Sequence, residues 1–543
     1  MTADSGNTGA LIALALKRAG VTHLFTLNGG HIWPVLMGAE EYGIRIIDVR
    51  HEQSAAFAAE GWAKVTRQCG VAAVTAGPGV TNSISALAQA QANDTPMLVI
   101  GGRAPAARWG MGSLQEMDHV ELTRSLTKSS ETINVPEDAY RSTAEGMRIA
   151  LSRRTGPVFM DVPIDVFFGA ADLPEATEHL VPDPGPPPDP QQVEAAARLI
   201  REAQRPVVLA GGGVWWAHAE EELRSLVEGA NLPLTVNGMA RGMLPPGHPL
   251  YFSRSRRVAL GDADVVVLAG VMLDFRVNFG QPPVFAEDAR LIYLDVDDHR
   301  KHRPPEASIY GDLKAGLSAL SRAVQGAAPR GPWLDLLRED DANVRRGEKE
   351  ITDSDSSPVH PARLIAEVDR FIDDDAIVVG DGGDFISFAG RLVERPRPGL
   401  WIDPGPYGCL GSGPGYAMAA KLAYPDRQVV LLSGDGAFGF SAMEFDTMVR
   451  HHIPVVCVIG NNGIWALEKH PMQKMLGLSI AADLGPSTRY DKVVQALGGH
   501  GEMVDRPDQI RPALERAFAS GLPACINVIC DPEAEYPRSS VLM

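Results

Sequence analysis

Short apolar runs alternate with helix-like stretches along almost the whole chain, and this alternation restricts the fold more than any other feature. The runs THLFTL, IRIIDV, GVAAVTA and PMLVIGG alternate with alanine-rich segments such as EQSAAFAAEGWAKVTR. The pattern returns in RPVVLAGGG and ADVVVLAG, and again in RQVVLLSGDG and IPVVCVIGNN. Strands that alternate with helices form parallel sheets covered by helices on both faces. We therefore expect an α/β protein with several doubly wound sheets.

Two polar stretches divide the chain into three blocks of similar size, which fits about three domains at roughly 100–200 residues each. VPDPGPPPDP at 181–190 is typical of a stiff linker, because proline neither continues a helix nor joins a central strand. The polar RRGEKEITDSDSSP closes the second block. We predict three doubly wound parallel-sheet domains at residues 1–165, 191–345 and 359–543, with linkers at 166–190 and 346–358 and a C-terminal tail on the last domain.

Composition and charge exclude several classes of protein. The chain has 68 acidic and 50 basic residues, a net charge of -18, whereas nucleic-acid-binding proteins present a basic face. No apolar run reaches the roughly 18 residues of a membrane span, and the N-terminal segment lacks the basic start and cleavage site of a signal peptide. The cysteines have no metal-ligand spacing and are typical of reduced thiols. We expect a cytoplasmic protein that binds neither membrane nor nucleic acid.

Polar residues follow two strand-like runs in the third block. Gly434-Asp435-Gly436 comes after RQVVLLS, and Asn461-Asn462 comes after IPVVCVI. Adjacent parallel strands would bring both loops to the carboxyl edge of one sheet, where ligands bind in open α/β folds. Asp435 and Asn462 offer the hard oxygen ligands that Mg²⁺ prefers, and the glycines allow backbone amides to approach phosphate oxygens. The pair predicts a site for a metal ion and a diphosphate.

This pair of loops resembles the metal- and diphosphate-binding motif of thiamine-diphosphate enzymes. By that resemblance, Asp435, Asn462 and the backbone carbonyl of Ile464 ligate Mg²⁺. The resemblance also assigns further residues to the thiamine diphosphate site: Gly382, Asp384, Gly434, Gly436 and Ala437.

The first block completes the resemblance. RHEQSAAFAAEGWAK and VTAGPGVTN resemble the pyrimidine-binding domain of the acetolactate synthase and decarboxylase branch, which makes residues 359–543 the diphosphate-binding domain. The resemblance gives Glu52 the catalytic task of hydrogen-bonding the cofactor's aminopyrimidine. It places Gly79 beside the cofactor, and Leu410, in YGCLGSGPG, under the bend of the cofactor. In relatives these two domains face each other across subunits, so a homo-oligomer is expected, a dimer at least and a tetramer by preference.

Three kinds of carbon–carbon chemistry compete within this branch. LFTLNGGHIWP, IIDVRHE and VAAVTAGPGVTN look most like 2-hydroxyacyl-CoA lyases of the acetolactate-synthase-like type. GGHI, RHE and SLQ also look like benzaldehyde lyase, and GDGAFGFSAMEF looks like oxalyl-CoA decarboxylase. The preferred interpretation is a reversible lyase that cleaves a 2-hydroxyacyl-CoA, including branched ones such as 2-hydroxyisobutyryl-CoA, into formyl-CoA and an aldehyde or ketone. Intact Glu52, Asp435 and Asn462 argue against a non-catalytic homologue.

Arginines distinguish a CoA ester from a smaller substrate, because the CoA nucleotide carries several phosphate groups. HPLYFSRSRRVALGDADVV resembles the CoA-using branch and lacks the flavin-binding histidine–glycine segment of acetolactate synthase, so FAD is not expected. Candidates for contact with the acyl-CoA substrate, or with ADP in the central domain, are Arg254, Arg257, Arg276, Asp295 and Arg397. Arg256, in the same run, is a further candidate, and Arg254, Arg256 and Arg257 alternatively belong to a solvated surface.

His31 is the candidate for removal of the substrate's 2-hydroxyl proton. It follows Asn28-Gly29-Gly30 after THLFTL, at the carboxyl end of a predicted strand. An unperturbed histidine pKa of about 6.5 suits this task near neutral pH. Alternatively, His31 caps the next turn or packs beside Trp33. The resemblance assigns Gln115 to catalysis as well, and it places the following residues at the border of the substrate: Leu114, Trp465 and Glu468.

Overall fold

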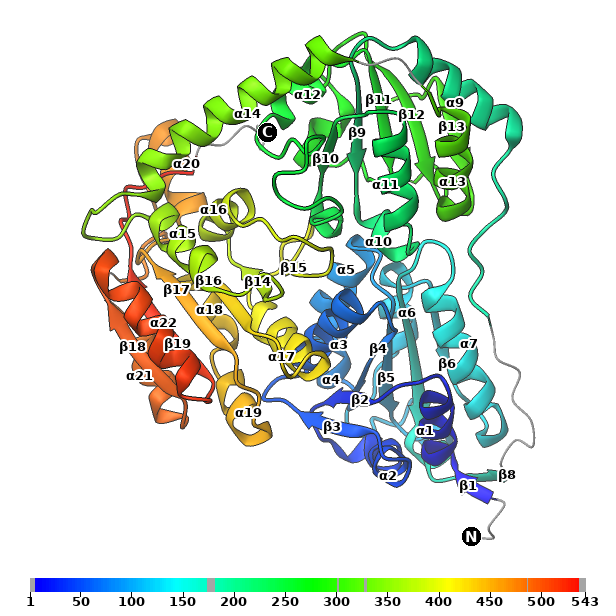
Figure 1. Ribbon diagram of the computed structural model, residues 1–543. Coiled ribbons are helices and arrows are strands. Elements are labelled where there is room, and N and C mark those ends of the chain that lie inside the picture. Colours follow the sequence, from blue (N-terminus) through cyan, green and yellow to red (C-terminus); the bar gives the residue numbers. More distant parts are fainter. Residues whose placement is uncertain (1–4, 173–180, 300–301, 327–329, 486, 537–543) are drawn as a thin grey trace.

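A computed structural model describes residues 5–172, 181–299, 302–326, 330–485 and 487–536 of the chain. Three parallel sheets, each flanked by helices, form three domains that meet around a common centre (Figure 1). In Figure 1 the first domain is blue to cyan, the second green, and the third yellow to red. The expected α/β architecture of three doubly wound domains is confirmed. The last residues of the predicted tail, 537–543, lie outside the described part of the chain.

The first domain has a six-stranded parallel sheet in the order β3-β2-β4-β5-β7-β6. Its strands are β2 (His23–Thr26), β3 (Arg45–Asp48), β4 (Gly70–Val74), β5 (Met97–Arg103), β6 (Ser129–Thr132) and β7 (Pro157–Pro163). Its helices are α1 (Thr8–Arg18), α2 (Trp33–Glu41), α3 (Glu52–Thr66), α4 (Pro78–Asn82), α5 (Ile84–Ala92), α6 (His119–Thr123), α7 (Ala139–Leu151) and α8 (Ile164–Phe167). Strands β4 and β5 are apolar and buried along almost their whole length, as central strands covered on both faces must be.

The second domain has a five-stranded parallel sheet in the order β10-β9-β11-β12-β13. Its strands are β9 (Pro206–Ala210), β10 (Leu234–Val236), β11 (Val265–Ala269), β12 (Arg290–Asp295) and β13 (Ala307–Tyr310). Its helices are α9 (Pro190–Glu202), α10 (Gly212–Trp216), α11 (Glu220–Gly229), α12 (Arg256–Gly261), α13 (Leu313–Ala323) and α14 (Gly331–Thr352). Asp189 begins α9 because its carboxylate accepts the Gln191 N–H, directly before a proline at the first helical position.

The third domain has a six-stranded parallel sheet in the order β15-β14-β16-β17-β19-β18. Its strands are β14 (Ile377–Asp381), β15 (Trp401–Ile402), β16 (Val429–Gly434), β17 (Val456–Asn461), β18 (His500–Val504) and β19 (Ala524–Ile529). Its helices are α15 (Pro361–Phe371), α16 (Asp384–Leu392), α17 (Gly413–Ala423), α18 (Asp435–Ser441), α19 (Glu444–His451), α20 (Ala466–Leu476), α21 (Tyr490–Ala496) and α22 (Ile510–Ala519).

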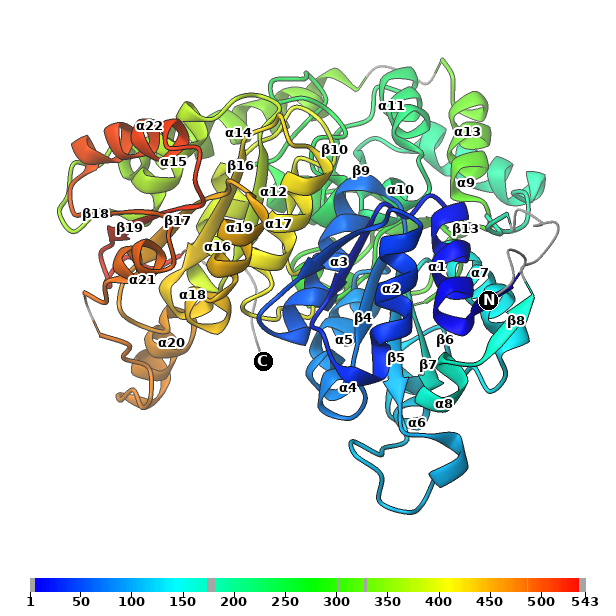
Figure 2. The ribbon, with the colours of Figure 1, turned by 90° about the horizontal axis from the view of Figure 1, so that it is seen from below.

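Helices α3 and α17 join the first and third domains into one core (Figures 1 and 2). Their close approach depends on glycine. A Cβ at Gly61 would lie 2.7 Å from the Tyr416 Cα, and one at Gly415 would lie 2.9 Å from the Phe57 Cβ. The rings of Phe57 and Tyr416 then meet edge to face, 6.2 Å apart. This contact fixes the start of α3 relative to the segment that precedes α17.

Both predicted linker ranges contain regular structure. Strand β8 (Ala170–Asp172) lies within 166–190 and pairs antiparallel with β1 (Ser5–Asn7), while residues 173–180 are outside the described part. The stretch predicted to begin a linker at 346 is helical as far as Thr352, because α14 continues through it. Its charges are not simply solvated, since Glu348 is buried and accepts hydrogen bonds from Arg254 and Arg391. Polar composition alone therefore misplaced this boundary.

Candidate functional site

Asp435 ties together the two polar loops of the third domain. Strands β16 and β17 are neighbours, with Gly434 opposite Gly460, so their following loops meet at one edge of the sheet. The Asp435 carboxylate accepts the N–H of Gly436 at 3.0 Å and the N–H of Gly463 at 2.9 Å. The two loops therefore meet at the carboxyl edge of the sheet, as predicted.

A small cavity of about 40 Å³ lies at this edge. Ten of the predicted residues line it: Gly382, Asp384, Gly434, Asp435, Gly436, Ala437, Asn462, Ile464, Trp465 and Glu468. Gly382 has a φ of +115°, a conformation that favours glycine, and a Cβ at Gly434 would meet open space. The exposed backbone of these turns is suited to a diphosphate group.

The donor set of this cavity fits a magnesium ion. Asp435 is 3% exposed, and burial raises its pKa to about 6. Its hydrogen bonds come from backbone amides, and no lysine or arginine of the described residues forms an ion pair with it. No group of three His, Cys, Asp or Glu side chains in the described ranges could hold a metal, so a cation here needs amide and backbone oxygens. Asn462 and Ile464 line the same cavity and are the residues that would provide these oxygens.

The turn that carries Leu410 is fixed from both sides. Before it, the Cys409 N–H donates to Gln89 Oε1 of the first domain at 2.8 Å. After it, the Gly411 and Gly413 N–H groups donate to the two carboxylate oxygens of Asp381, at 3.2 and 2.8 Å. Burial raises the pKa of Asp381 to about 7. Sequence reasoning missed Gln89 and Asp381, although Asp381 stands in the same GDGGD run as Gly382 and Asp384.

Glu52 is the first residue of α3, and the preceding His51 caps the helix by accepting the Gln53 N–H. The Glu52 side chain is buried and its Oε2 accepts a hydrogen bond from Asn82 Nδ2 at 2.9 Å. Gly79 is also buried, in the short helix α4 that ends at Asn82. The cavity at the edge of the third sheet is lined by third-domain residues, so Glu52 and Gly79 lie outside it. The two predicted halves of the cofactor site are thus present but separate.

His31 and Gln115 are connected through one hydroxyl group. Thr75 Oγ1 donates to Gln115 Oε1 at 3.4 Å, so it accepts from His31 Nδ1 at 3.3 Å. This chain places the proton on Nδ1 and leaves Nε2 as the acceptor nitrogen. Burial lowers the pKa of His31. The imidazole is therefore neutral near neutral pH. The His31 ring is buried and hydrogen-bonded to Thr75, unlike a side chain that caps the next turn. Trp33, its neighbour in the packing alternative, is 54% exposed.

The three substrate-border candidates occupy different surroundings. Leu114 is 76% exposed on the segment between β5 and α6, which projects from the first sheet in Figure 2. Trp465 and Glu468 line the third-domain cavity, and the indole of Trp465 fills the space in front of Gly436, whose Cβ would lie 2.4 Å from the ring.

Arg276 and Asp295 line a second cavity of about 240 Å³, where the second domain meets the first and third. Gly211 and Gly213 line it as well, and the Nδ2 of Asn237, another lining residue, is buried without a hydrogen-bond partner. The guanidinium of Arg276 is held by Asp274 at 2.6 Å. Sequence reasoning missed the other cationic residues of this lining, which are Lys64 of α3 and, in the segment that follows α7, Arg153 and Arg154.

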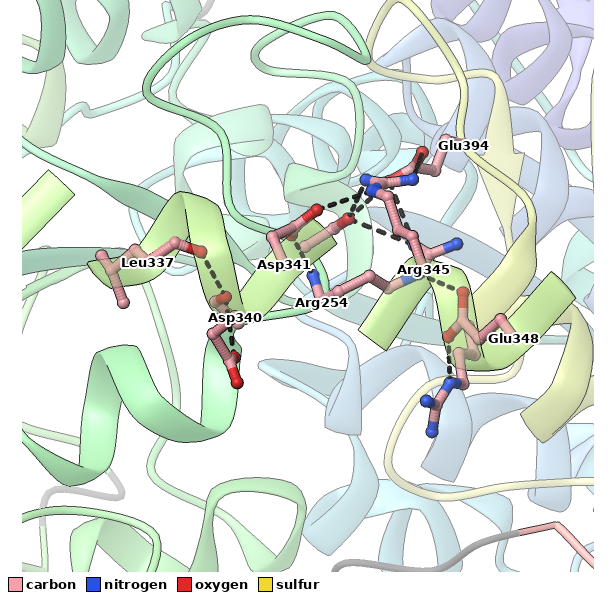
Figure 3. Close-up of polar contacts among 10 residues, drawn as sticks. Arg254, Leu337, Asp340, Asp341, Arg345, Glu348 and Glu394 are labelled. Carbon is pink, nitrogen blue, oxygen red and sulfur yellow. Dashed lines mark hydrogen bonds and ion pairs between the residues drawn. The ribbon is translucent and has the colours of Figure 1, made fainter. Parts of the chain in front are cut away.

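Arg254 does not have the role predicted for it. Its side chain is 7% exposed, and its guanidinium pairs with Glu348 at 2.9 Å and Glu394 at 3.1 Å, in the network of Figure 3. Arg345 reinforces this network by pairing with Glu394 and Asp341. Because both carboxylates are already close to it, Arg254 joins α14 to the third domain and is not available to a phosphate group. Arg257 and Arg397 are exposed.

Arg256, between Arg254 and Arg257, lies in a more cationic environment. Burial, together with the smaller effects of the Arg276 and Arg241 charges, lowers its pKa to about 10. The Nε of Arg241 is buried without a hydrogen-bond partner, and its guanidinium lies 5.1 Å from the centre of a Trp401 ring. The guanidinium groups of Arg241, Arg256 and Arg276 thus lie close enough to influence one another, and Asp274 pairs with that of Arg276.

Three family models match successive parts of the chain. They are the N-terminal binding domain of thiamine pyrophosphate enzymes at residues 6–122, their central domain at 193–320 and their C-terminal binding domain at 381–528. The acetolactate synthase large subunit of Mycobacterium tuberculosis is 52% identical, with 99% of this chain and 98% of that protein covered. 2-Hydroxyacyl-CoA lyase 2 of Caenorhabditis elegans is 35% identical (94% and 87% covered), and its namesake from Homo sapiens is also 35% identical (96% and 89%).

Among the described residues, no helix combines the length and the apolar character needed to cross a membrane.

Proposed function

The chain belongs to the thiamine pyrophosphate enzyme family, and we propose that within this family it is a Mg²⁺-dependent 2-hydroxyacyl-CoA lyase. In the proposed reaction the bond between C1 and C2 breaks. The 2-hydroxyl group loses its proton and becomes the carbonyl of an aldehyde or ketone. C1 gains a proton and leaves as formyl-CoA, so the atoms balance without an oxidant or reductant.

Membership of this family confirms the prediction of a thiamine-diphosphate enzyme, and relatives named as lyases agree with the predicted carbon–carbon lyase. When bound, thiamine diphosphate supplies the electron sink for the bond that breaks. The side chains supply orientation and proton transfer. Asp435, Asn462 and the Ile464 carbonyl would hold the magnesium ion, and Glu52 would hydrogen-bond the pyrimidine ring.

The observation that carries the proposal is the state of His31. A substrate with a 2-hydroxyl group needs a neutral base beside the breaking bond, and the Thr75 contact leaves His31 Nε2 as an acceptor. The lowered pKa keeps this nitrogen unprotonated at neutral pH. Gln115, at the other end of the same chain, is placed to hydrogen-bond the carbonyl oxygen of the substrate.

Recognition of a CoA ester is supported by the cationic residues between the second and third domains. Arg241 and Arg256 offer guanidinium groups to phosphates, whereas Asp274 already pairs with that of Arg276. Arg397, shortly before β15 in the sequence, is exposed. The cavity that Arg276, Asp295 and Asn237 line fits a nucleotide head such as ADP.

The separation of the two halves of the cofactor site supports a homo-oligomer. Glu52 lies outside the third-domain cavity of its own chain. A second copy that brings its first domain to this cavity would complete the site, so we propose a dimer as the smallest active form and a tetramer as the favoured one.

An acetolactate synthase is the second candidate, because a relative of that name is 52% identical over nearly the whole chain. That reaction uses 2-keto acids, which carry neither a nucleotide nor a 2-hydroxyl group. The two candidates therefore make opposite demands on the arginine cluster and on His31.

Parallel assays with four substrates separate the candidates. Purified enzyme with thiamine diphosphate and Mg²⁺ is given 2-hydroxyisobutyryl-CoA, mandelyl-CoA, benzoin or pyruvate, and the products are identified by mass spectrometry. The proposal predicts the highest kcat/KM for a CoA ester. Faster conversion of pyruvate would favour the acetolactate synthase, and faster cleavage of benzoin would favour a benzaldehyde lyase.

A further inference from the structure

Asp161, at the end region of β7, is a fully buried carboxylate that holds three side chains. It accepts hydrogen bonds from Arg103 Nη1 at 2.9 Å, His119 Nδ1 at 3.0 Å and Thr132 Oγ1 at 2.6 Å. Arg103 is the last residue of β5, and His119 is the first residue of α6. One carboxylate therefore fixes both ends of the intervening segment 104–118.

His119 passes this constraint to the Gly77 turn. The Gly77 N–H donates to His119 Nε2 at 2.9 Å, so Nε2 carries the lone pair and Nδ1 carries the proton given to Asp161. The ring is fully buried between these two partners. His119 is therefore held in one tautomer and one orientation, and it has no path to the substrate.

Gly77 in turn packs against Gln115. A Cβ at Gly77 would lie 2.9 Å from the Gln115 Cβ and 3.1 Å from its carbonyl oxygen. Gln115 itself has a φ of +59°, a left-handed conformation that is unfavourable for a non-glycine residue. The surrounding structure must offset this cost, and the Gly77 turn is the neighbour that confines Gln115.

The segment 104–118 needs such an anchor because its own packing is weak. It projects from the first sheet in Figure 2, and Trp109, Met111 and Leu114 on it are exposed. Arg103 supports its start, with the guanidinium 3.9 Å from the centre of a Trp109 ring, and Asp118 near its end lies 3.8 Å from the same guanidinium.

We propose that Asp161 and His119 form a positioning pair that sets the conformation of the Gly77 turn. This turn then keeps Gln115 and His31, which are connected through Thr75, in the relative positions needed to remove the 2-hydroxyl proton. The proposal rests on the proposed function for the role of Gln115 and His31. Neither Asp161 nor His119 exchanges a proton with the substrate. Their contribution is geometric, and their loss should affect turnover far more than cofactor binding.

Three variants test the pair in the full-length enzyme. His119→Leu removes both hydrogen bonds. His119→Gln keeps them, because an amide oxygen can accept the Gly77 N–H while the amide nitrogen donates to Asp161. Thr123→Val is the matched control, since it removes buried hydrogen bonds from the same helix, to the His119 carbonyl and to Ser130, without touching Asp161 or Gly77.

Two readouts are measured for each variant. The first is kcat and KM with a 2-hydroxyacyl-CoA, together with the affinity for thiamine diphosphate by calorimetry. The second is hydrogen exchange of the Gly77 amide by mass spectrometry, which needs neither substrate nor cofactor. In His119→Leu we expect kcat to fall about tenfold to a hundredfold, as for a misplaced active-site group, with cofactor affinity retained. Gly77 exchange should rise at least about tenfold, while His119→Gln stays within about threefold of the parent in both readouts.

Unchanged kcat and unchanged Gly77 exchange in His119→Leu would overturn the proposal, as would an equal fall of kcat in Thr123→Val. If the parent enzyme cleaves no CoA ester, yet Gly77 exchange rises in His119→Leu alone, the positioning of the turn stands and the proposed function fails.

Discussion

The buried carboxyl group of Asp381 predicts a pH-dependent change in stability, and the magnitude of this change follows from the structure. This carboxyl group is fully buried and accepts two backbone N–H groups, from Gly411 and Gly413, on the turn that carries Leu410. Burial raises its pKa from 3.8 to about 7. Asp381→Asn keeps the shape of the side chain and one acceptor oxygen but removes the ionisation.

The raised pKa means that the folded chain binds this proton more tightly than the unfolded chain. Stability is therefore lost as pH rises from about 4 to about 7, and the full cost above that range is about 4 kcal/mol, at ~1.4 kcal/mol per pKa unit. Between about pH 6 and pH 8 the same relation gives ~1.4 kcal/mol. The hydrogen bond lost in Asp381→Asn costs the same at both pH values. The variant should therefore gain about tenfold in relative stability over this interval, whatever its absolute stability.

Native-state hydrogen exchange of β14 and β16 amides measures this difference without assuming that the three domains unfold together. Asp491→Asn is the control. Burial alone would raise the pKa of Asp491, but the hydrogen bonds from Arg489 lower it, so this variant should gain nothing at the higher pH. The reasoning is refuted if Asp381→Asn shows the same stability difference from the parent at both pH values.

Three further substitutions have defined outcomes. Glu52→Gln keeps an acceptor for Asn82, so calorimetry should show normal cofactor binding, while turnover falls at least about a hundredfold; full activity would remove Glu52 from the mechanism. Asp435→Ala should abolish Mg²⁺-dependent binding of thiamine diphosphate in the same assay, and unchanged affinity would disprove the metal assignment. His31→Ala should lower the single-turnover rate of cleavage while cofactor affinity stays the same, and a variant that keeps most of its rate would assign the base to another group.

The fold and the meeting of the two polar loops were predictable because they depend on local pattern. Apolar runs between helical stretches indicate parallel strands, and the residues directly after such strands meet at one edge. Asp435 and Asn462 follow neighbouring strands, so they could be placed together without knowledge of any distant contact. Gly382 and Asp384, which follow a third strand of the same sheet, were assigned only through the resemblance to thiamine-diphosphate enzymes.

The arginine assignments depended on tertiary partners that local pattern does not contain. Arg254 and Arg256 are two residues apart in one basic run, yet Glu348 and Glu394 neutralise the first, and the second lies among other guanidinium groups. Glu348 comes from the polar stretch that was predicted to be a linker. The same missing contact thus explains both the misplaced boundary and the misassigned arginine.

The positioning pair of Asp161 and His119 could not be predicted from the sequence for a related reason. His119 and Asp161 are far apart in sequence, and neither stands in a motif that suggests catalysis. Their importance follows only from the parallel pairing of β5 with β7, which brings the end of one strand beside Asp161. The positive φ of Gln115 is likewise a property of the backbone that composition does not show.

The most direct test of the central claim is cleavage of 2-hydroxyisobutyryl-CoA in D₂O by the enzyme loaded with thiamine diphosphate and Mg²⁺. The proposed reaction takes up one solvent proton at C1, so it predicts acetone and formyl-CoA that carries one deuterium, in equal amounts. Absence of formyl-CoA, together with acetolactate formed from pyruvate under the same conditions, would contradict the assignment as a 2-hydroxyacyl-CoA lyase.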